Sequence, residues 1–205
     1  MARPAKFTRD QIIDGALAAV AVHGKNATLG HVCAGLGAPV GSIYHRFPTR
    51  EHLFVELWLR SIRRFHVGLL EAATTPDPGG ALAACAVHIP RYCREHPGEA
   101  LAMTLYRQRV LATEAPEELV EDVRTLNDAV QVAMRRLCSK RYGRVTDHRL
   151  ILVGTAVQQC PYGLVRPYVG AAVPPWLDDA VVVSSTAILA LGDRAGSAAT
   201  LRPCT

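Results

Sequence analysis

The sequence lacks most of the features that mark an enzyme, a secreted protein or a membrane protein. Its six cysteines are dispersed without a Cys-x-x-Cys pair, which is typical of free thiols in a reducing cytosol rather than of a disulfide framework. It has no glycine-rich phosphate loop and no paired acid–base constellation, so we expect no catalytic site. The longest weakly polar run, residues 171–191, is broken by prolines and aspartates, and no apolar core of signal-peptide length is present near residue 1. We therefore expect a cytoplasmic protein without a membrane span.

What the sequence does have is apolar residues and an uneven charge. Apolar residues make up 49% of the 205 residues, enough to bury a sizeable core. The formal net charge is +5. Residues 1–50 carry six basic and two acidic side chains, whereas the remaining 155 residues net only +1. A small basic head on a near-neutral body suggests that the head binds a polyanion, with a solvated arm as the alternative interpretation.

Every strong pattern in the chain is helical, which predicts an all-α fold. Thr8 and Gln11 have the spacing of a capping box, and Phe7 and Ile12 have that of a hydrophobic staple, so a first helix is expected to start at Thr8. A buried stripe follows at residues 13, 16, 17 and 20. Gly24 is expected to end this helix in the left-handed conformation.

Further helix boundaries follow from caps and breakers. Thr28 is predicted to cap a short second helix, Pro39 lies at the first turn of a third, and Thr49 is predicted to cap a long fourth helix that ends near Glu71. The breaker cluster at residues 74–80 is the clearest connection. Beyond it we expect five more helices. Their approximate ranges are 81–96 with a kink at Pro90, 98–113, 116–141, 146–166 with a bend, and 175–192.

Two short helices separated by a glycine-containing turn form a helix-turn-helix over about residues 28–48. A recognition helix must present small or hydrogen-bonding side chains so that its backbone can approach the major groove, while Ile43 and Phe47 are expected to face the core. The predicted DNA-contacting residues are Thr28, Pro39, Val40, Gly41, Ser42, Tyr44, His45, Arg46, Thr49 and Arg50.

The run from Thr28 to Glu51, and more broadly from Thr8 to Trp58, resembles the TetR family of bacterial transcriptional regulators. The resemblance implies an Ω-like homodimer of about nine helices per chain. It also implies that the last two helices form a four-helix bundle with their symmetry mates, and that a ligand cavity lies between the middle helices. The chain departs from the family at Pro39 and Val40, where the family usually has a polar residue followed by lysine. We expect Val40 to contact a thymine methyl group instead.

This organisation predicts three segments. Residues 8–68 would be the helix-turn-helix DNA-binding domain, residues 69–195 the helical ligand-binding and dimerisation domain, and residues 196–205 a flexible tail. Small residues in the helices at 146–166 and 175–192 would let helices approach closely, and we predict that these helices form the homodimer.

The ligand pocket leaves the weakest signal in the sequence. Consecutive glutamines at 158 and 159 lie in an apolar stretch, where buried amides would need partners such as a ligand or water. The predicted pocket residues are Ile89, Tyr92, Met103, Tyr106, Leu126, Val130, Gln158, Gln159, Tyr162 and Trp176. The apolar members have ordinary core packing as their alternative role.

Cys85-x-x-His88 and Cys93-x-x-His96 form a tempting metal pattern. The two pairs are eight residues apart, about 12 Å at helical rise, which is too far for one tetrahedral zinc. We therefore expect no metal and no other cofactor. The alternative role for these cysteines is that of a thiol redox sensor.

The resulting hypothesis is a ligand-responsive transcriptional repressor that is not an enzyme. It would bind a palindromic operator DNA as a homodimer and be released by a small-molecule effector of unknown class, without a membrane partner. Two alternatives stay open: a helical protein-interaction module, and an enzyme without a recognisable active site.

Overall fold

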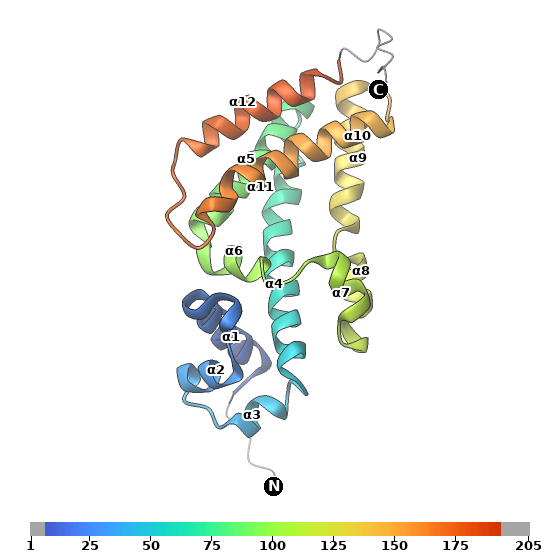
Figure 1. The fold of residues 1–205 in the computed structure, drawn as a ribbon. Coiled ribbons are helices and arrows are strands. Elements are labelled where there is room, and N and C mark those ends of the chain that lie inside the picture. The colour runs from blue at the N-terminus through green and yellow to red at the C-terminus, as the bar shows by residue number, and fades with distance from the viewer. Residues whose placement is uncertain (1–6, 194–205) are drawn as a thin grey trace, which may run out of the picture. The chain divides into compact units, whose positions relative to one another are not determined.

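A computed structural model of the chain describes residues 7–193, and within this range every regular element is helical (Figure 1). The first helices are α1 (Arg9–His23), α2 (Leu29–Leu36), α3 (Val40–Tyr44), α4 (Arg50–Ala72) and α5 (Pro78–Glu95). The later helices are α6 (Pro97–Met103), α7 (Gln108–Glu114), α8 (Val120–Thr125), α9 (Asp128–Tyr142), α10 (Asp147–Gly154), α11 (Cys160–Val165) and α12 (Leu177–Ala190). The predicted all-α fold is confirmed. The predicted tail at 196–205 lies outside the described residues.

The start of α1 follows the predicted capping box. The Thr8 hydroxyl accepts from the Gln11 amide, and the Gln11 side chain accepts from the Thr8 amide at 2.8 Å. The end of α1 differs from the prediction, because Gly24 has a φ of 56° but a ψ of −134°, which is not the left-handed helical region. The chain therefore turns directly into a short 3₁₀ helix, η1 (Gly24–Asn26), before α2.

The caps of α2 and α4 fix the ends of the helix-turn-helix. Thr28 caps α2, and the ring Nδ1 of His31 accepts from the Thr28 amide at 3.3 Å, so a histidine takes the place that glutamate usually has in a capping box. Gly37 ends α2 with a φ of 60° and a ψ of 32°, a left-handed conformation that favours glycine. Thr49 caps α4 by accepting from the His52 amide at 3.0 Å.

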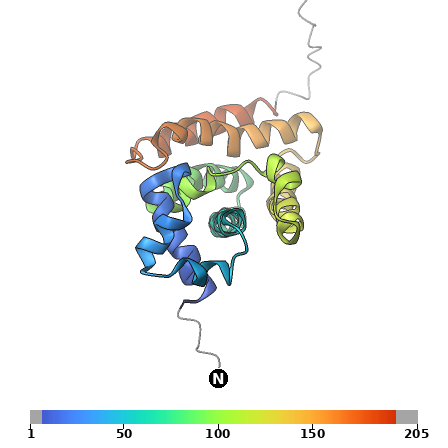
Figure 2. The ribbon, with the colours of Figure 1, turned by 60° about the horizontal axis from the view of Figure 1, so that its bottom comes forward.

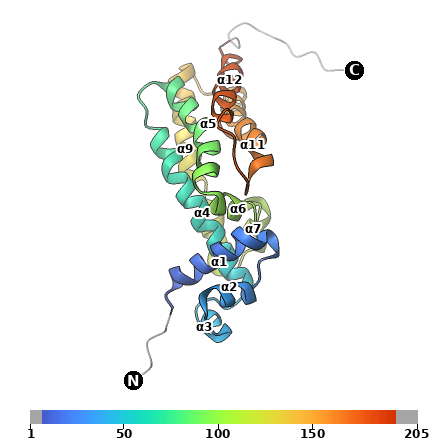
Figure 3. The same ribbon diagram turned by 90° about the vertical axis from the view of Figure 1, so that its left-hand side faces the viewer.

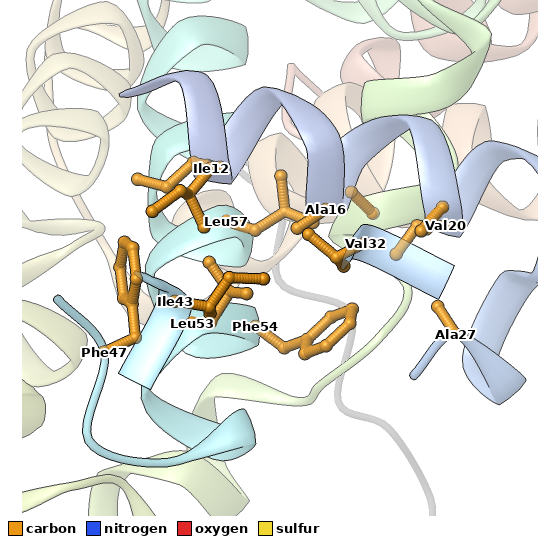
Figure 4. Packing of buried hydrophobic residues seen from close by; sticks show 13 residues of the cluster. Ile12, Ala16, Val20, Ala27, Val32, Ile43, Phe47, Leu53, Phe54 and Leu57 are labelled. Atoms are coloured by element: carbon orange, nitrogen blue, oxygen red, sulfur yellow. The ribbon is translucent and has the colours of Figure 1, made fainter. Parts of the chain in front are cut away.

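One core cluster joins α1, α2, α3 and the first part of α4 (Figure 4). Its largest members are almost completely buried, and they are Ile12, Val20, Val32, Ile43, Phe47, Leu53, Phe54 and Leu57. Burial of each such side chain stabilises the fold by roughly 1.5–3 kcal/mol. Gly15 permits the close packing of α1 on α2, because a Cβ at this position would lie 2.8 Å from Cγ of Leu36. Figure 3 shows α1 and α2 next to each other, with α3 following α2.

The chain divides into two compact units. The first unit contains the residues up to Val67 together with Tyr92–Asp128 and Val169–Ala172. The second unit contains Gly68–Arg91, Ala129–Tyr168 and the residues from Val173 onward. The first unit thus includes Tyr92–Asp128, a segment that we predicted to belong to the ligand-binding and dimerisation domain. Helices α4 and α5 each contribute residues to both units.

Two of the predicted long helices are interrupted. The range 98–113 contains α6 and α7 with a break at residues 104–107, and the range 116–141 contains a 3₁₀ turn, α8 and α9. The break before α9 has a visible cause, because the Gln108 amide donates to the carbonyl of Val123 at 2.7 Å and also bonds the side chain of Asn127. A side chain thus satisfies a carbonyl that a continuous helix would bond through its own backbone.

In the second unit, α12 lies side by side with the segment from α10 to α11 (Figures 1 and 2). The predicted irregularity of this segment takes the form of a π-helical stretch, η3 (Thr155–Gln159). Pro161 lies two residues after this stretch, and in a regular helix its ring would clash with the carbonyl four residues earlier. The buried hydroxyl of Ser185 in α12 donates to the carbonyl of Ala156 at 2.7 Å, which fixes the two segments to each other. No helix among the described residues combines the length and the hydropathy needed to span a bilayer.

Candidate nucleic-acid interface

Helix α3 separates its side chains cleanly into an inner and an outer set. Ile43 and, just beyond the helix, Phe47 are 0% exposed, whereas Val40 and Tyr44 are 48% and 50% exposed. His45 is also exposed. The predicted inward and outward orientations agree with this pattern. An exposed row of valine, tyrosine and histidine on a short helix suits contact with a partner surface.

Gly41, at the second position of α3, has no internal packing role. A Cβ at this position would meet no atom within 4 Å, so nothing inside the chain requires a glycine there. Glycine in a helix costs about 1 kcal/mol relative to alanine. A glycine at this position is explained if the helix backbone closely approaches an external surface, such as a DNA groove.

Arg9 holds the residues that follow α3 to the rest of the first unit. Its Nη1 donates to the carbonyl of Arg46 at 2.9 Å, its guanidinium pairs with Glu56 on α4, and its Cζ lies 4.4 Å from the centre of the Phe47 ring. His52 completes the cluster through a 2.9 Å contact with Glu56. In the sequence analysis Arg9 was only one of the basic residues of the N-terminal head. Its contact with Glu56 spans 47 residues, and no local sequence pattern indicates such a contact.

Arg50 has an internal role besides its predicted contact with DNA phosphate. Its Nη2 donates to the carbonyl of Ala27 at 2.7 Å, and its Cζ lies 4.4 Å from the centre of the Phe54 ring. Burial, and then Glu51, raise the pKa of the Tyr106 phenol, whereas Arg50 lowers it. The clamp ties the start of α4 to the residue that precedes the cap of α2. The phosphate contact stays a prediction.

The remaining predicted DNA contacts lie at or near the surface. Thr28, Pro39 and Thr49 are exposed, and Ser42 and Arg46 are half-buried. Both threonine hydroxyls accept backbone amides as caps, but each keeps its own O–H to donate outward. The caps and a phosphate contact are therefore compatible at these positions.

The predicted ligand-pocket residues differ in burial and are divided between the two units. Ile89, Tyr92, Leu126 and Val130 are buried, Met103 and Tyr106 are half-buried, and Gln158, Gln159, Tyr162 and Trp176 are exposed. The first unit holds Tyr92, Met103, Tyr106 and Leu126, and the second unit holds the others.

The argument that Gln158 and Gln159 are buried is wrong. The helix turns Ala156 and Val157 inward and leaves both glutamines on the outer side, where Gln159 accepts from the Thr155 hydroxyl at 3.3 Å. The apolar neighbours in the sequence belong to the opposite side of the helix, so they did not indicate burial of the amides.

The first unit contains a buried polar cluster that the sequence analysis did not predict. The carboxylate of Glu99 in α6 is 8% exposed and bonds both the guanidinium of Arg64 on α4 and the hydroxyl of Tyr92 at the end of α5. Burial, and then Glu99, raise the pKa of Tyr92, and the hydrogen bond with Glu99 raises the pKa of Arg64. The cluster links three helices through one carboxylate. The sequence around Glu99 does not indicate this role, because an acidic residue in the first turn of a helix such as α6 is common.

The first unit also has two open grooves. A groove of about 690 Å³ lies between α1 and α2, with the stacked rings of His23 and His31 on its wall at a centroid distance of 3.7 Å. A second groove of about 480 Å³ is lined by α1, α4 and the region of α8, where Arg63 pairs with Asp122 at 2.9 Å. Most polar side chains of the second groove pair with one another.

The cysteine and histidine pattern of α5 has a structural role. Cys85 and Cys93 are buried, and the Cys85 thiol contacts the carbonyl of Leu69 at 3.5 Å. Burial raises the pKa of Cys85 to about 12 and that of Cys93 to about 11. Among the described residues, no group of three or more histidine, cysteine, aspartate or glutamate side chains could hold a metal ion.

The second unit exposes apolar side chains along α10 to α12. Ile151 is 64% exposed and Val183 is 70% exposed. The other exposed large apolar residues in and beside these helices are Tyr162, Trp176, Val182 and Leu191. A face of this composition is typical of a protein–protein contact.

Comparison with known proteins agrees with this geometry. The model of the family described as bacterial regulatory proteins, tetR family, matches residues 12–57. A search of curated protein sequences gives no match. A transcriptional regulator from Rhodococcus sp. RHA1 has a similar structure, with a TM-score of 0.72, 19% identity and coverage of 90% of this chain and 97% of its own.

Two other solved structures share the fold. The TetR-family regulator PfmR from Thermus thermophilus has a TM-score of 0.68 at 20% identity, over 90% of this chain and 96% of its own. The ketosteroid transcriptional regulator KstR2 of Mycobacterium tuberculosis has a TM-score of 0.66 at 16% identity, over 90% of this chain and 94% of its own. At these identities the likeness concerns the fold.

Proposed function

We propose, from the premise that this chain is a TetR-family transcriptional regulator, that it is a repressor which binds a palindromic operator as a homodimer and is released by a small molecule. The observation that carries the DNA-binding part is the outer face of α3. Tyr44 and His45 are exposed beside Gly41, whose backbone is open to close approach. The inner face of α3 is fixed by the core and by Arg9.

In this proposal Tyr44, His45, Thr28 and Thr49 contact phosphates and set the register of the protein on the duplex. Ser42 and Val40 face base edges, where valine offers a thymine methyl group an apolar contact. Arg46 and Arg50 add positive charge near the phosphates. Since Arg50 also clamps Ala27, its substitution would mix a structural effect with a DNA effect, and Tyr44 is the cleaner probe.

The dimer is proposed to form through the exposed apolar face of α10 to α12. Small residues such as Gly154 and Ala187 lie in the same helices and permit close approach. A two-fold axis would pair the recognition helices about 34–36 Å apart, one turn of DNA, or a multiple of this distance. Gln158, Gln159 and Tyr162 then belong to the dimer contact in place of a ligand pocket.

Release by a small molecule requires that ligand and operator favour different states of the dimer. Helix α4 is the proposed connection, because one continuous helix starts at the DNA-binding end with Arg50 and continues into the second unit to Ala72. A ligand preference of about 1–3 kcal/mol for one state changes operator affinity roughly 5–150-fold. The relatives that match are regulators, and nothing in the proposed role involves catalysis.

The test is a selection of duplexes from a random pool, followed by footprinting of the best sequence. We expect protection of two major-groove half-sites related by a two-fold axis. Tyr44→Phe should weaken binding to every duplex by a similar factor, whereas Ser42→Ala should change the preferred base at one position per half-site. Failure to enrich any sequence, with DNA affinity equal for all duplexes, would contradict an operator-binding repressor.

The dimer has its own test. Sedimentation of the full chain at micromolar concentration should give the mass of two chains. Val183→Glu, which places a charge on the proposed contact, should give a monomer that keeps its helical circular dichroism spectrum. A wild-type monomer under these conditions would rule out the proposed dimer without affecting the helix-turn-helix.

A further inference from the structure

The near-neutral charge outside residues 1–50 conceals a strongly basic stretch. Residues 129–146 contain five arginine and lysine side chains and no aspartate or glutamate. This stretch alone therefore equals the formal net charge of the whole chain, +5. It covers most of α9 and the turn after it, in the second unit, and is separate in sequence from the helix-turn-helix. The basic stretch accordingly needs an explanation other than operator binding by α3.

Three cations within α9 have no partner in the described part of the chain, and neither has Arg144 in the turn after this helix. Arg135, Arg136 and Lys140 are exposed, and none of them makes a hydrogen bond or an ion pair with a described residue. Their neighbours behave differently, since Arg141 pairs with Asp193 at 2.6 Å and Arg149 donates to backbone carbonyls such as that of Arg144 at 3.1 Å. We call Arg135, Arg136 and Lys140 the α9 basic face.

The helix dipole explains only part of this face. Cations stabilise the last turn of a helix, which accounts for Lys140, but Arg135 and Arg136 lie more than a turn before the end of α9 at Tyr142. Arg136 and Lys140 are also four residues apart, a spacing at which like charges repel and destabilise a helix. The face therefore carries an electrostatic cost that an anionic partner would remove.

Duplex DNA fits the chemistry of this face better than an acidic protein does. Protein–protein contacts rely on buried aromatic or aliphatic anchors, and the single large apolar side chain that α9 exposes here is Val132. Phosphate contacts need only arginine and lysine. The three cations span about 7.5 Å of helix axis, over which a duplex presents roughly four phosphate charges.

We propose that the α9 basic face is a second, sequence-independent DNA-binding surface, which takes the phosphate backbone of a duplex segment other than the one that α3 reads. A regulator anchored at its operator would present this face to a second segment of the same DNA molecule. Linkage through one molecule gives that segment a high effective concentration, so a weak contact is sufficient. The function of the surface is to hold two segments of DNA together.

The experiment removes the first DNA-binding surface before it measures the second. Tyr44→Glu with His45→Glu, two exposed positions on and just after α3, serves as the background, and circular dichroism checks its fold. Binding of a fluorescent duplex of random sequence, about 30 base pairs long, is then titrated at roughly 20–200 mM salt. We expect residual binding with a salt slope of about 2–3, as for three phosphate contacts. Adding Arg135→Gln, Arg136→Gln and Lys140→Gln should lower the affinity at least about tenfold at the lowest salt.

A charge-matched control separates this surface from net charge. Arg107→Gln, Arg109→Gln and Arg124→Gln remove the same charge from exposed positions of the first unit, and this variant should keep its affinity within about threefold. Equal losses in the two triple variants, or no residual duplex binding in the background, would overturn the proposal. Competition by polyglutamate as strong as that by duplex at equal charge would instead assign the face to an acidic protein. None of these outcomes depends on whether α3 recognises an operator.

Discussion

The two units differ in how their arginine and lysine side chains are paired. In the first unit, five arginines bind groups of their own unit, and these pairs are Arg9–Glu56, Arg50–Ala27 carbonyl, Arg60–Asp14, Arg63–Asp122 and Arg64–Glu99. In the second unit, Arg91 and Arg141 pair with aspartates, but the α9 basic face has no partner among the described residues. These five arginines of the first unit hold its segments together, although Arg107, Arg109 and Arg124 of the same unit are exposed without such a pair among the described residues. In the second unit, the three cations that lack a described partner belong to the single helix α9.

Apolar side chains show the same difference. Seven of the twelve exposed large apolar residues in the described part of the chain belong to the second unit, and most of these lie along α10 to α12. The exposed apolar residues of the first unit include Val40 and Tyr44 of α3 itself. Exposed large apolar side chains of the first unit thus lie on α1, α3, α4 and α7, and this unit also has two open grooves. In the second unit most of them lie along α10 to α12, and three cations without a partner in the described part of the chain lie on α9.

The largest effect is expected from the core of the first unit. Phe47→Ala removes a ring that is 0% exposed and on which the Arg9 guanidinium stacks. The free energy of unfolding should therefore fall by about 3–5 kcal/mol. Urea unfolding followed by circular dichroism measures the loss. The matched variant is Val132→Ala on α9, which is 69% exposed and should change stability by less than about 0.5 kcal/mol. A large loss in Val132→Ala would mean that this surface of α9 is covered in solution.

A smaller effect separates the engaged cations from the free ones. Arg9→Gln loses the ion pair with Glu56, the bond to the Arg46 carbonyl and the stacking on Phe47. Because the Arg9 side chain is 46% exposed, solvent screens part of this energy, and we expect a loss of about 1–2 kcal/mol. Arg136→Gln removes the same charge from the α9 basic face and should leave the urea midpoint unchanged or slightly higher, because its repulsion with Lys140 is relieved. A comparable loss in both variants would erase the distinction between the two sets of cations.

The same contrast explains what the sequence could predict. Thr8, Thr28 and Thr49 cap the helices that they were expected to cap, and Ile43 and Phe47 are buried as expected, because caps and apolar periodicity act within a few residues. Contacts between distant segments left no such local trace. The bond from Gln108 to the Val123 carbonyl breaks a helix that periodicity alone would continue. The Glu99 cluster joins three helices in a similar way.

The candidate DNA face could be predicted for a related reason. A short helix with outward Tyr44 and His45 and inward Ile43 is a local pattern, and the structure confirms those orientations. The ligand pocket stays a prediction, since any apolar stretch is compatible with a core, a pocket or a dimer contact. Gln158 and Gln159 show the ambiguity, because their apolar neighbours indicated burial and the π-helical stretch instead leaves them outside.

Helix caps should behave alike in both units, since a cap is a local contact. Thr28→Ala at α2 and Thr146→Ala at α10 each remove a hydroxyl that accepts a backbone amide, at 3.2 and 3.3 Å. Each variant should lose about 1 kcal/mol of unfolding free energy, as measured in urea. If only one of the two loses stability, the difference between the units would extend to their local structure and would not be confined to their surfaces.

The smallest effect concerns the cysteines, and it tests whether the interiors of the two units are equally closed. Cys85 belongs to the second unit and Cys93 to the first, and burial raises the pKa of these thiols to about 12 and about 11. At pH 8 roughly one Cys93 thiol in a thousand is ionised, and only the thiolate reacts quickly. Among the cysteines of residues 7–193, alkylation with iodoacetamide, read by mass spectrometry of the folded chain, should therefore modify the half-buried Cys33 and Cys160 first.

The same shifts set a pH dependence of stability. An unfolded thiol ionises near pH 8.5, whereas the folded thiols of Cys85 and Cys93 do not ionise until about pH 12 and 11. Their contribution to folding is thus complete below about pH 8.5 and is lost as the pH rises toward the folded values, because the unfolded state releases its protons first. Urea midpoints should fall between about pH 8.5 and 10. Cys85→Ser with Cys93→Ser should flatten this fall, since neither residue would then lose a proton in the unfolded state. Rapid alkylation of either buried cysteine at about pH 8 would mean that its unit opens locally, and the two interiors would then differ as their surfaces do.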